Sequence, residues 1–201
     1  MSAETSPAAP SAASAIADPG PLGLAAFALT TFVLSTFNAG LLSGKLEATV
    51  LPLAFFYGGI VQVLAGMWEF KKNNTFGALA FSSYGAFWLS FAGLVKIVVP
   101  ALLVADPGEV DKAVGLFLLA WTIFTVYMTV AAFKTNVALT FVFVVLSLTF
   151  LALTISKFGG NASIGKLGGW LGLITAALAW YTSAAGVTKS TWGRSILPTG
   201  R

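Results

Sequence analysis

The sequence contains no histidine and no cysteine. This excludes disulfide bonds, thiol chemistry and imidazole bases, together with the usual ligand sets for zinc, haem and iron–sulfur clusters. Charge is scarce as well: 9% of the 201 residues are Asp, Glu, Lys or Arg, against about a quarter in a soluble domain. We therefore expect no metal site, no other cofactor and no soluble globular fold.

In place of charge the sequence has long apolar runs, and 57% of its residues are hydrophobic. The charge-free stretches are Pro19–Gly44, Ala48–Trp68, Asn73–Val95, Ala113–Phe133, Thr135–Ser156 and Leu167–Thr188. Each exceeds the ~20 residues that cross ~30 Å of hydrocarbon as a helix. The strands of an outer-membrane barrel are shorter and alternate polar with apolar residues. The sequence predicts an all-α integral membrane protein, a bundle of six transmembrane helices.

The two ends of the chain differ from this apolar domain. Residues 1–18 are rich in Ala, Ser and Pro and lack the basic start and apolar core of a secretory signal, so we expect a disordered N-terminal tail. The six-helix domain then occupies 19–188, and 189–201 forms a C-terminal tail. Six spans place both termini on one side, where basic residues are the more numerous. This predicts a multi-pass protein of the plasma (cell inner) membrane with both termini in the cytoplasm.

The 11 basic residues are scattered singly or in pairs near the expected helix ends. Such residues are typical of topology signals and interface anchors, so we expect no nucleic-acid partner. Lys96 is interpreted as a lysine that extends toward the interface ahead of a helix break at Pro100. Glu69 closes the second apolar run beside two lysines, which favours an interface residue over a proton carrier. Because the spans hold no paired carboxylates, a membrane enzyme has little support.

The first apolar run carries two patterns that bear on function. Asp18 and Gly20 lie at its beginning, and a helix start there is either an anion site or a capped end at the membrane surface. Phe27, Thr31, Ser35 and Asn38 follow at i, i+4, i+8 and i+11, on one helical stripe. Polar residues within a membrane helix usually face protein or water rather than lipid.

The second run places Gln62 in a row with Ala54, Gly58 and Gly66 at spacings of four. Small residues at this spacing allow membrane helices to approach closely, and this is their commonest role. Close approach of the backbone to a narrow pore is the alternative. Both roles can hold on different faces of one helix.

The stretch Asp18–Leu24 resembles the N-P-A-P-L-G-L signature of the acetate uptake transporter family, which includes bacterial succinate–acetate permeases and fungal ammonia/acetate relatives. Further matches lie at Phe56–Gly59, Glu69–Gly77, Ser83–Trp88, Gly159–Ala162, Gly168–Trp170 and Gly193–Pro198. The resemblance extends from residue 18 to residue 198, with the motifs in the family's order.

This resemblance implies a homohexamer in the lipid bilayer, with one pore per protomer for acetate and related small monocarboxylates. The family's constriction corresponds to Phe27, Tyr84 and Leu146, and a further size-setting position to Ala179. We expect Asp18, Gly20, Leu22, Thr30, Thr31, Asn38, Gln62 and Ala179 to line the substrate path, and the resemblance makes Glu69 a candidate for proton transfer or gating.

The implied function is passage of acetate, with succinate as a further substrate, by a channel or a proton-linked carrier. The alternatives are a membrane sensor or scaffold, and an ammonium-linked exporter without acetate uptake. Two positions depart from the signature, since Asp18 replaces its Asn and Gly20 replaces its Ala. A negative charge at an anion entrance is expected to repel the substrate.

Overall fold

The computed structural model describes residues 16–200. The predicted disordered tail at 1–18 therefore lies outside the described residues, except for its last three positions. The α-helices are α1 (Gly20–Asn38), α2 (Leu51–Phe55), α3 (Gln62–Lys71), α4 (Thr75–Gly93), α5 (Val99–Ala105), α6 (Val110–Ala132), α7 (Val137–Gly159) and α8 (Ala162–Trp192). The short segments between them are the 3-10 turns η1 (Gly44–Val50) and η4 (Pro107–Glu109) and the π turns η2 (Phe56–Val61) and η3 (Leu94–Val98).

Consecutive elements join into candidate membrane spans, and the described residues contain 6 of them. Their bounds are Gly20–Asn38, Gly44–Lys71, Thr75–Ala105, Pro107–Ala132, Val137–Gly159 and Ala162–Trp192. Each span contains most of one charge-free run. The predicted six-helix membrane bundle is confirmed.

The helix break expected at Pro100 does not occur. The third span continues to Ala105, with the π turn η3 directly ahead of α5 and Pro100 in the first turn of α5. Proline lacks an N–H group, and a π turn shifts the hydrogen-bond register so that the backbone can continue around the missing donor. Lys96 lies in this turn and is exposed.

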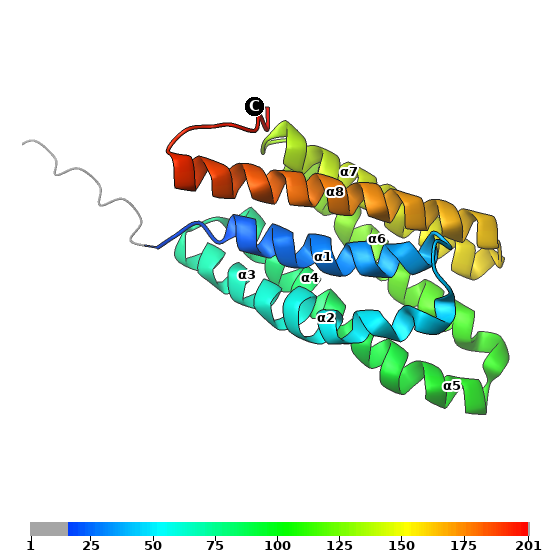
Figure 1. The fold of residues 1–201 in the computed structure, drawn as a ribbon. Coiled ribbons are helices and arrows are strands. Elements are labelled where there is room, and N and C mark those ends of the chain that lie inside the picture. Colours follow the sequence, from blue (N-terminus) through cyan, green and yellow to red (C-terminus); the bar gives the residue numbers. More distant parts are fainter. Residues whose placement is uncertain (1–15, 201) are drawn as a thin grey trace, which may run out of the picture.

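The spans alternate in direction through the bundle (Figure 1). The start of α1, the α3–α4 connection and the end of α8 lie at one end, which we call the tail end. The η1 turn, the α5–α6 connection and the α7–α8 connection lie at the other, the loop end (Figure 1). Helix α1 packs against α8 and α3, while α7 packs against α6 and α8. Helices α1, α4 and α7 all run from the tail end toward the loop end.

Small residues stand where helices approach most closely. A Cβ atom on Gly169 of α8 would overlap the backbone of Ala39 at the end of α1, and one on Gly58 would lie 2.8 Å from Cβ of Thr30. On α3, a Cβ on Gly66 would lie 2.5 Å from the backbone nitrogen of Ser82. The helix-packing role of the small-residue rows is thus present in the structure.

Two helices end at positions that differ from the ends of their charge-free runs. Helix α1 ends at Asn38, well before Gly44, and Gly40 follows with a φ of 76° that favours glycine. Helix α8 continues past residue 188 to Trp192, where Gly193 takes a φ of 66° as a left-handed C-cap. The first part of the predicted C-terminal tail is therefore helical.

Candidate functional site

Two cavities enter the bundle from opposite ends. The tail-side cavity has a volume of about 370 Å³, and its lining includes Asp18, Lys72 and Lys189. The loop-side cavity has a volume of about 700 Å³ and is lined near its mouth by Lys45, Glu47, Asp111, Lys157 and Lys166. Phe27 and Leu146 line both cavities, so these two side chains mark the level at which the cavities meet.

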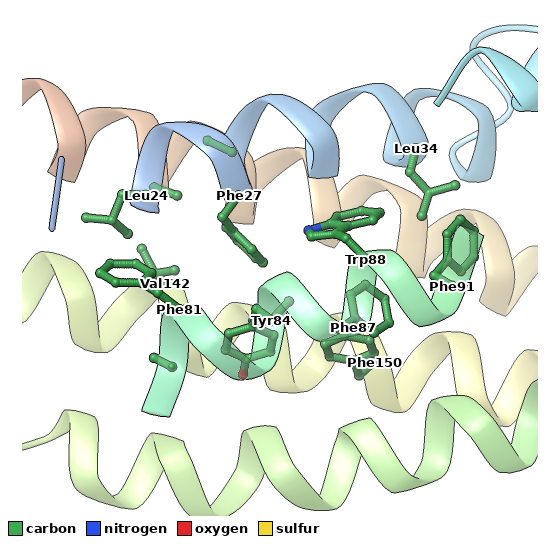
Figure 2. Packing of buried hydrophobic residues seen from close by; sticks show 14 of the residues in the cluster. Leu24, Phe27, Leu34, Phe81, Tyr84, Phe87, Trp88, Phe91, Val142 and Phe150 are labelled. Carbon is green, nitrogen blue, oxygen red and sulfur yellow. The ribbon is translucent and has the colours of Figure 1, made fainter. Parts of the chain in front are cut away.

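The structure brings together the three residues expected to form a constriction. Phe27, Tyr84 and Leu146 are buried in one apolar cluster and come from α1, α4 and α7. The ring centroids of Phe27 and Tyr84 are 5.7 Å apart, and Figure 2 shows Phe27 reaching from α1 toward α4. The Tyr84 hydroxyl donates to Oγ1 of Thr125 at 3.0 Å. This hydrogen bond holds the ring on α6 and satisfies a polar group that would otherwise be costly to bury.

Glu69 lines the tail-side cavity and is buried, with 2% of its surface exposed. This burial arises because the last turn of α3 packs against the first turn of α4. Nδ2 of Asn74 donates to Oε2 of Glu69 at 2.8 Å, and Oδ1 of Asn74 accepts from the Gly77 N–H at 3.2 Å. Asn74 thus caps α4 and partners a buried carboxyl group at the same time.

At the mouth of this cavity, two hydrogen bonds hold the side chain of Asp18. Pro19 occupies the N-cap position of α1, and Oδ1 of Asp18 accepts from the Gly20 N–H at 3.1 Å. The same oxygen accepts from Nζ of Lys72 at 2.8 Å. Sequence reasoning treated Lys72 only as a topology signal and missed this pairing. The lysine balances the charge that distinguishes Asp18 from the signature Asn.

The other predicted path residues either line one of the two cavities or line neither. Gly20 and Gln62 line the tail-side cavity, whereas Thr31 and Asn38 line the loop-side cavity together with Ser35. The polar stripe on α1 therefore does face a cavity. Leu22, Thr30 and Ala179 line neither cavity.

The helical periodicity explains these three exceptions. Leu22 lies half a turn away from Thr31 around α1 and is exposed. Thr30 faces Gly58 of η2, and its hydroxyl donates to the Ala26 carbonyl at 2.9 Å. Ala179 is fully buried in the apolar core.

Sequence reasoning also missed the role of the residues after α8. Ser195, Leu197 and Thr199 line the tail-side cavity. The Tyr181 hydroxyl donates to the Pro198 carbonyl at 2.6 Å, and the Ala138 N–H donates to the Thr199 carbonyl at 2.9 Å. These bonds attach the segment to α8 and α7. The motif at Gly193–Pro198 was the signal that could have indicated it.

Comparison with known proteins assigns this architecture to a family. Residues 2–199 match the GPR1/FUN34/yaaH family. The chain belongs to the GPR1/FUN34/yaaH family. It is 40% identical over 185 residues to the succinate–acetate/proton symporter SatP of Escherichia coli K12, covering 92% of this chain and 96% of that protein. It is also 41% identical over 184 residues to ammonia transport outward protein 2 of Saccharomyces cerevisiae, covering 89% of this chain.

A solved structure of the bacterial acetate channel SatP matches this family member with a TM-score of 0.84 and 39% identity, covering 92% of this chain and 99% of that one. The chain spans 64% of the length of its yeast relative. The resemblance seen in the sequence motifs is confirmed. Because these relatives are named as transporters and a channel, the prediction that the chain is not an enzyme is confirmed as well.

The double role of Asn74 leads to a stability prediction. Asn74→Ala removes the cap of α4, at a cost of ~0.5–2 kcal/mol, and also leaves the Glu69 carboxyl without its donor, at a further ~1–3 kcal/mol. Asn74→Ser keeps a good N-cap but is too short to reach Glu69. We expect Tm of the protein in detergent to be lowest for Asn74→Ala, intermediate for Asn74→Ser and highest for the wild type. If Asn74→Ser melts with the wild type, the contact with Glu69 contributes nothing to stability.

Proposed function

We propose that this chain carries acetate and related small monocarboxylates across the membrane through the level of Phe27, Tyr84 and Leu146. The observation that supports this most directly is that the two cavities, which enter from opposite ends, share Phe27 and Leu146 in their linings. The similarity to the SatP acetate channel supports the same substrate class. In this proposal Gly20, Gln62, Thr31 and Asn38 line the path.

The charges at the cavities favour an anion. Two lysines and two carboxyl groups line the tail-side cavity, and one lysine is engaged by Asp18. Three lysines and two carboxyl groups line the loop-side cavity, and Lys157 is paired with Asp111 at 2.7 Å, so a single cationic group is in excess there. An ammonium ion would meet repulsion at this mouth, whereas a carboxylate would be attracted. Among the functions considered, acetate passage therefore fits the cavities better than ammonium export.

The apolar constriction sets the energetic problem of this transport. Transfer of a bare carboxylate into an apolar environment costs several kcal/mol unless polar groups or water replace its hydration. The buried carboxyl of Glu69 lies along the tail-side cavity, apart from the constriction. A proton can therefore cross on the substrate itself or through Glu69. The first route describes a channel for the neutral acid, and the second describes a coupled carrier.

We further propose that the chain works as a homohexamer in the plasma membrane, with both termini in the cytoplasm. The family resemblance supports the hexamer, and the distribution of basic residues supports the orientation. Large exposed apolar side chains, including Trp68, Trp170 and Trp192, leave surface for lipid and for neighbouring copies. In this orientation the tail-side cavity opens to the cytoplasm.

Uptake of labelled acetate into proteoliposomes tests the proposed function. Acetate should enter vesicles that contain the protein faster than empty vesicles, which only the neutral acid crosses, and an imposed proton gradient should drive protein-dependent accumulation if a proton moves with the substrate. Glu69→Gln should abolish accumulation while leaving downhill flux if Glu69 carries the proton. Accumulation that survives Glu69→Gln places the proton on the substrate. Absence of any protein-dependent acetate flux contradicts the proposal.

The size of the constriction yields a selectivity prediction. Leu146→Ala should widen the level that joins the two cavities, so the ratio of lactate to acetate flux should rise about tenfold or more, as expected when several methylene groups leave a selective apolar site. Leu118→Ala is a matched control, because Leu118 is buried and lines only the loop-side cavity. Both variants should lose a similar ~2–5 kcal/mol of stability. If the two variants have the same ratio of lactate to acetate flux, Leu146 is not part of the constriction.

The ion pair at the tail-side mouth yields a prediction on affinity. Asp18→Asn keeps an acceptor for the Gly20 N–H but releases Lys72, so the mouth gains one positive charge. We expect KM for acetate to fall about two- to fivefold at low salt, and less at high salt. Adding Lys72→Gln should cancel this gain, whereas adding Lys71→Gln should preserve most of it. A KM that is unchanged at every salt concentration places Asp18 outside the path.

A further inference from the structure

Thr31 differs from the other threonines in the helices of this chain. Threonine hydroxyls there usually donate to the carbonyl four residues earlier, as Thr30 does to Ala26 at 2.9 Å and Thr149 does to Val145 at 2.8 Å. The Thr31 hydroxyl is buried and has no hydrogen-bond partner among the described residues. Thr31 lines the loop-side cavity. Thr31 therefore places a buried hydroxyl, without a partner in the described part of the chain, beside this cavity.

Trp88 carries a second buried donor without a partner. Its side chain is 2% exposed, and Nε1 has no acceptor among residues 16–200. The ring is held between Phe87 and Phe91, at centroid distances of 5.0 and 5.9 Å. Figure 2 shows the nitrogen end of the ring directed toward the part of α1 that carries Phe27. A buried indole N–H normally has an acceptor, so its isolation here needs an explanation.

The two donors lie at the same level of the bundle. Helices α1 and α4 run in the same direction, and the rings of Phe27 and Tyr84 contact each other across them. Thr31 follows Phe27 by four residues, and Trp88 follows Tyr84 by four. Each donor is therefore about one helical turn, ~6 Å, from the constriction on its loop side. Both residues line the loop-side cavity.

We propose that the Trp88 N–H and the Thr31 hydroxyl form a carboxylate subsite directly on the loop side of the constriction. This inference rests on the proposed function and names the groups that recognise the substrate there. A carboxylate leaving or entering the apolar level has lost much of its hydration, and two donors one turn away replace part of it. Both donors are neutral, so they hold the anion more weakly than a lysine would and allow it to move on.

The subsite also discriminates by chemistry. An indole N–H can only donate, so it binds the oxygen atoms of a carboxylate or carboxylic acid but offers nothing to an ammonium ion. The rings of Phe87 and Phe91 beside Trp88 provide an apolar surrounding for a short methyl group. The subsite is therefore matched to a small monocarboxylate.

Two substitutions test the subsite with little change of shape. Trp88→Phe keeps an aromatic ring but removes the N–H, and Thr31→Val keeps the volume but removes the hydroxyl. We expect each to raise KM for acetate about two- to tenfold, as the loss of one hydrogen bond does, with maximal flux retained.

The matched controls are Trp121→Phe and Thr30→Val. Trp121 contacts Tyr84 but lines neither cavity, and the Thr30 hydroxyl already has its acceptor. Both controls should keep the wild-type KM.

Indole N–H resonances of the wild-type protein provide a readout that does not depend on variants folding well. Acetate should shift the Trp88 signal and leave the Trp121 signal in place. If the wild type transports acetate but Thr31→Val keeps its KM and the Trp88 resonance does not move, the subsite is refuted and the proposed function stands. If the wild type carries no acetate, the proposed function itself fails.

Discussion

The contact between Phe27 and Tyr84 is the interaction on which the rest of the proposed pathway depends. It closes the bundle at the level where two cavities would otherwise run together, and Leu146 completes that level from α7. The ring of Tyr84 can take this position because its hydroxyl is satisfied by Thr125 on α6. A polar hydroxyl left unpaired at this depth would favour another orientation of the ring. The hydrogen bond outside the pathway therefore fixes the apolar surface inside it.

Close helix packing makes this level rigid. Gly58 allows α1 to contact the second span through Thr30, and Gly169 brings α8 against the end of α1. Without the hydrophobic effect to drive helices together in lipid, such close contacts supply much of the association between them. These contacts occupy other positions around α1, whereas Phe27 and Thr31 line the cavities.

The two cavities present different chemical groups to an anion. At the tail end, Lys72 is already engaged by the carboxylate of Asp18, and Glu69 is held by Asn74. The loop-side cavity has an excess of lysines at its mouth, and close to the constriction it offers the neutral donors of Trp88 and Thr31. In the proposed function, charge at the mouth attracts the substrate from a distance, whereas neutral donors near the apolar level replace lost hydration without binding the substrate too tightly.

The sequence alone determined the six spans, because the length of apolar chain needed to cross a bilayer is a local property of the chain. It also determined that Phe27, Thr31 and Asn38 share a face, since helical periodicity is local too. Periodicity does not say what a face meets, and that was decided by the tertiary structure. Glu69 became buried because α4 packs over it, and Leu22, Thr30 and Ala179 turned away from both cavities. Asp18 and Lys72, 54 positions apart, became a pair for the same reason. The environment of a charge depends on groups that distant segments bring to it, and only the packed bundle specifies them.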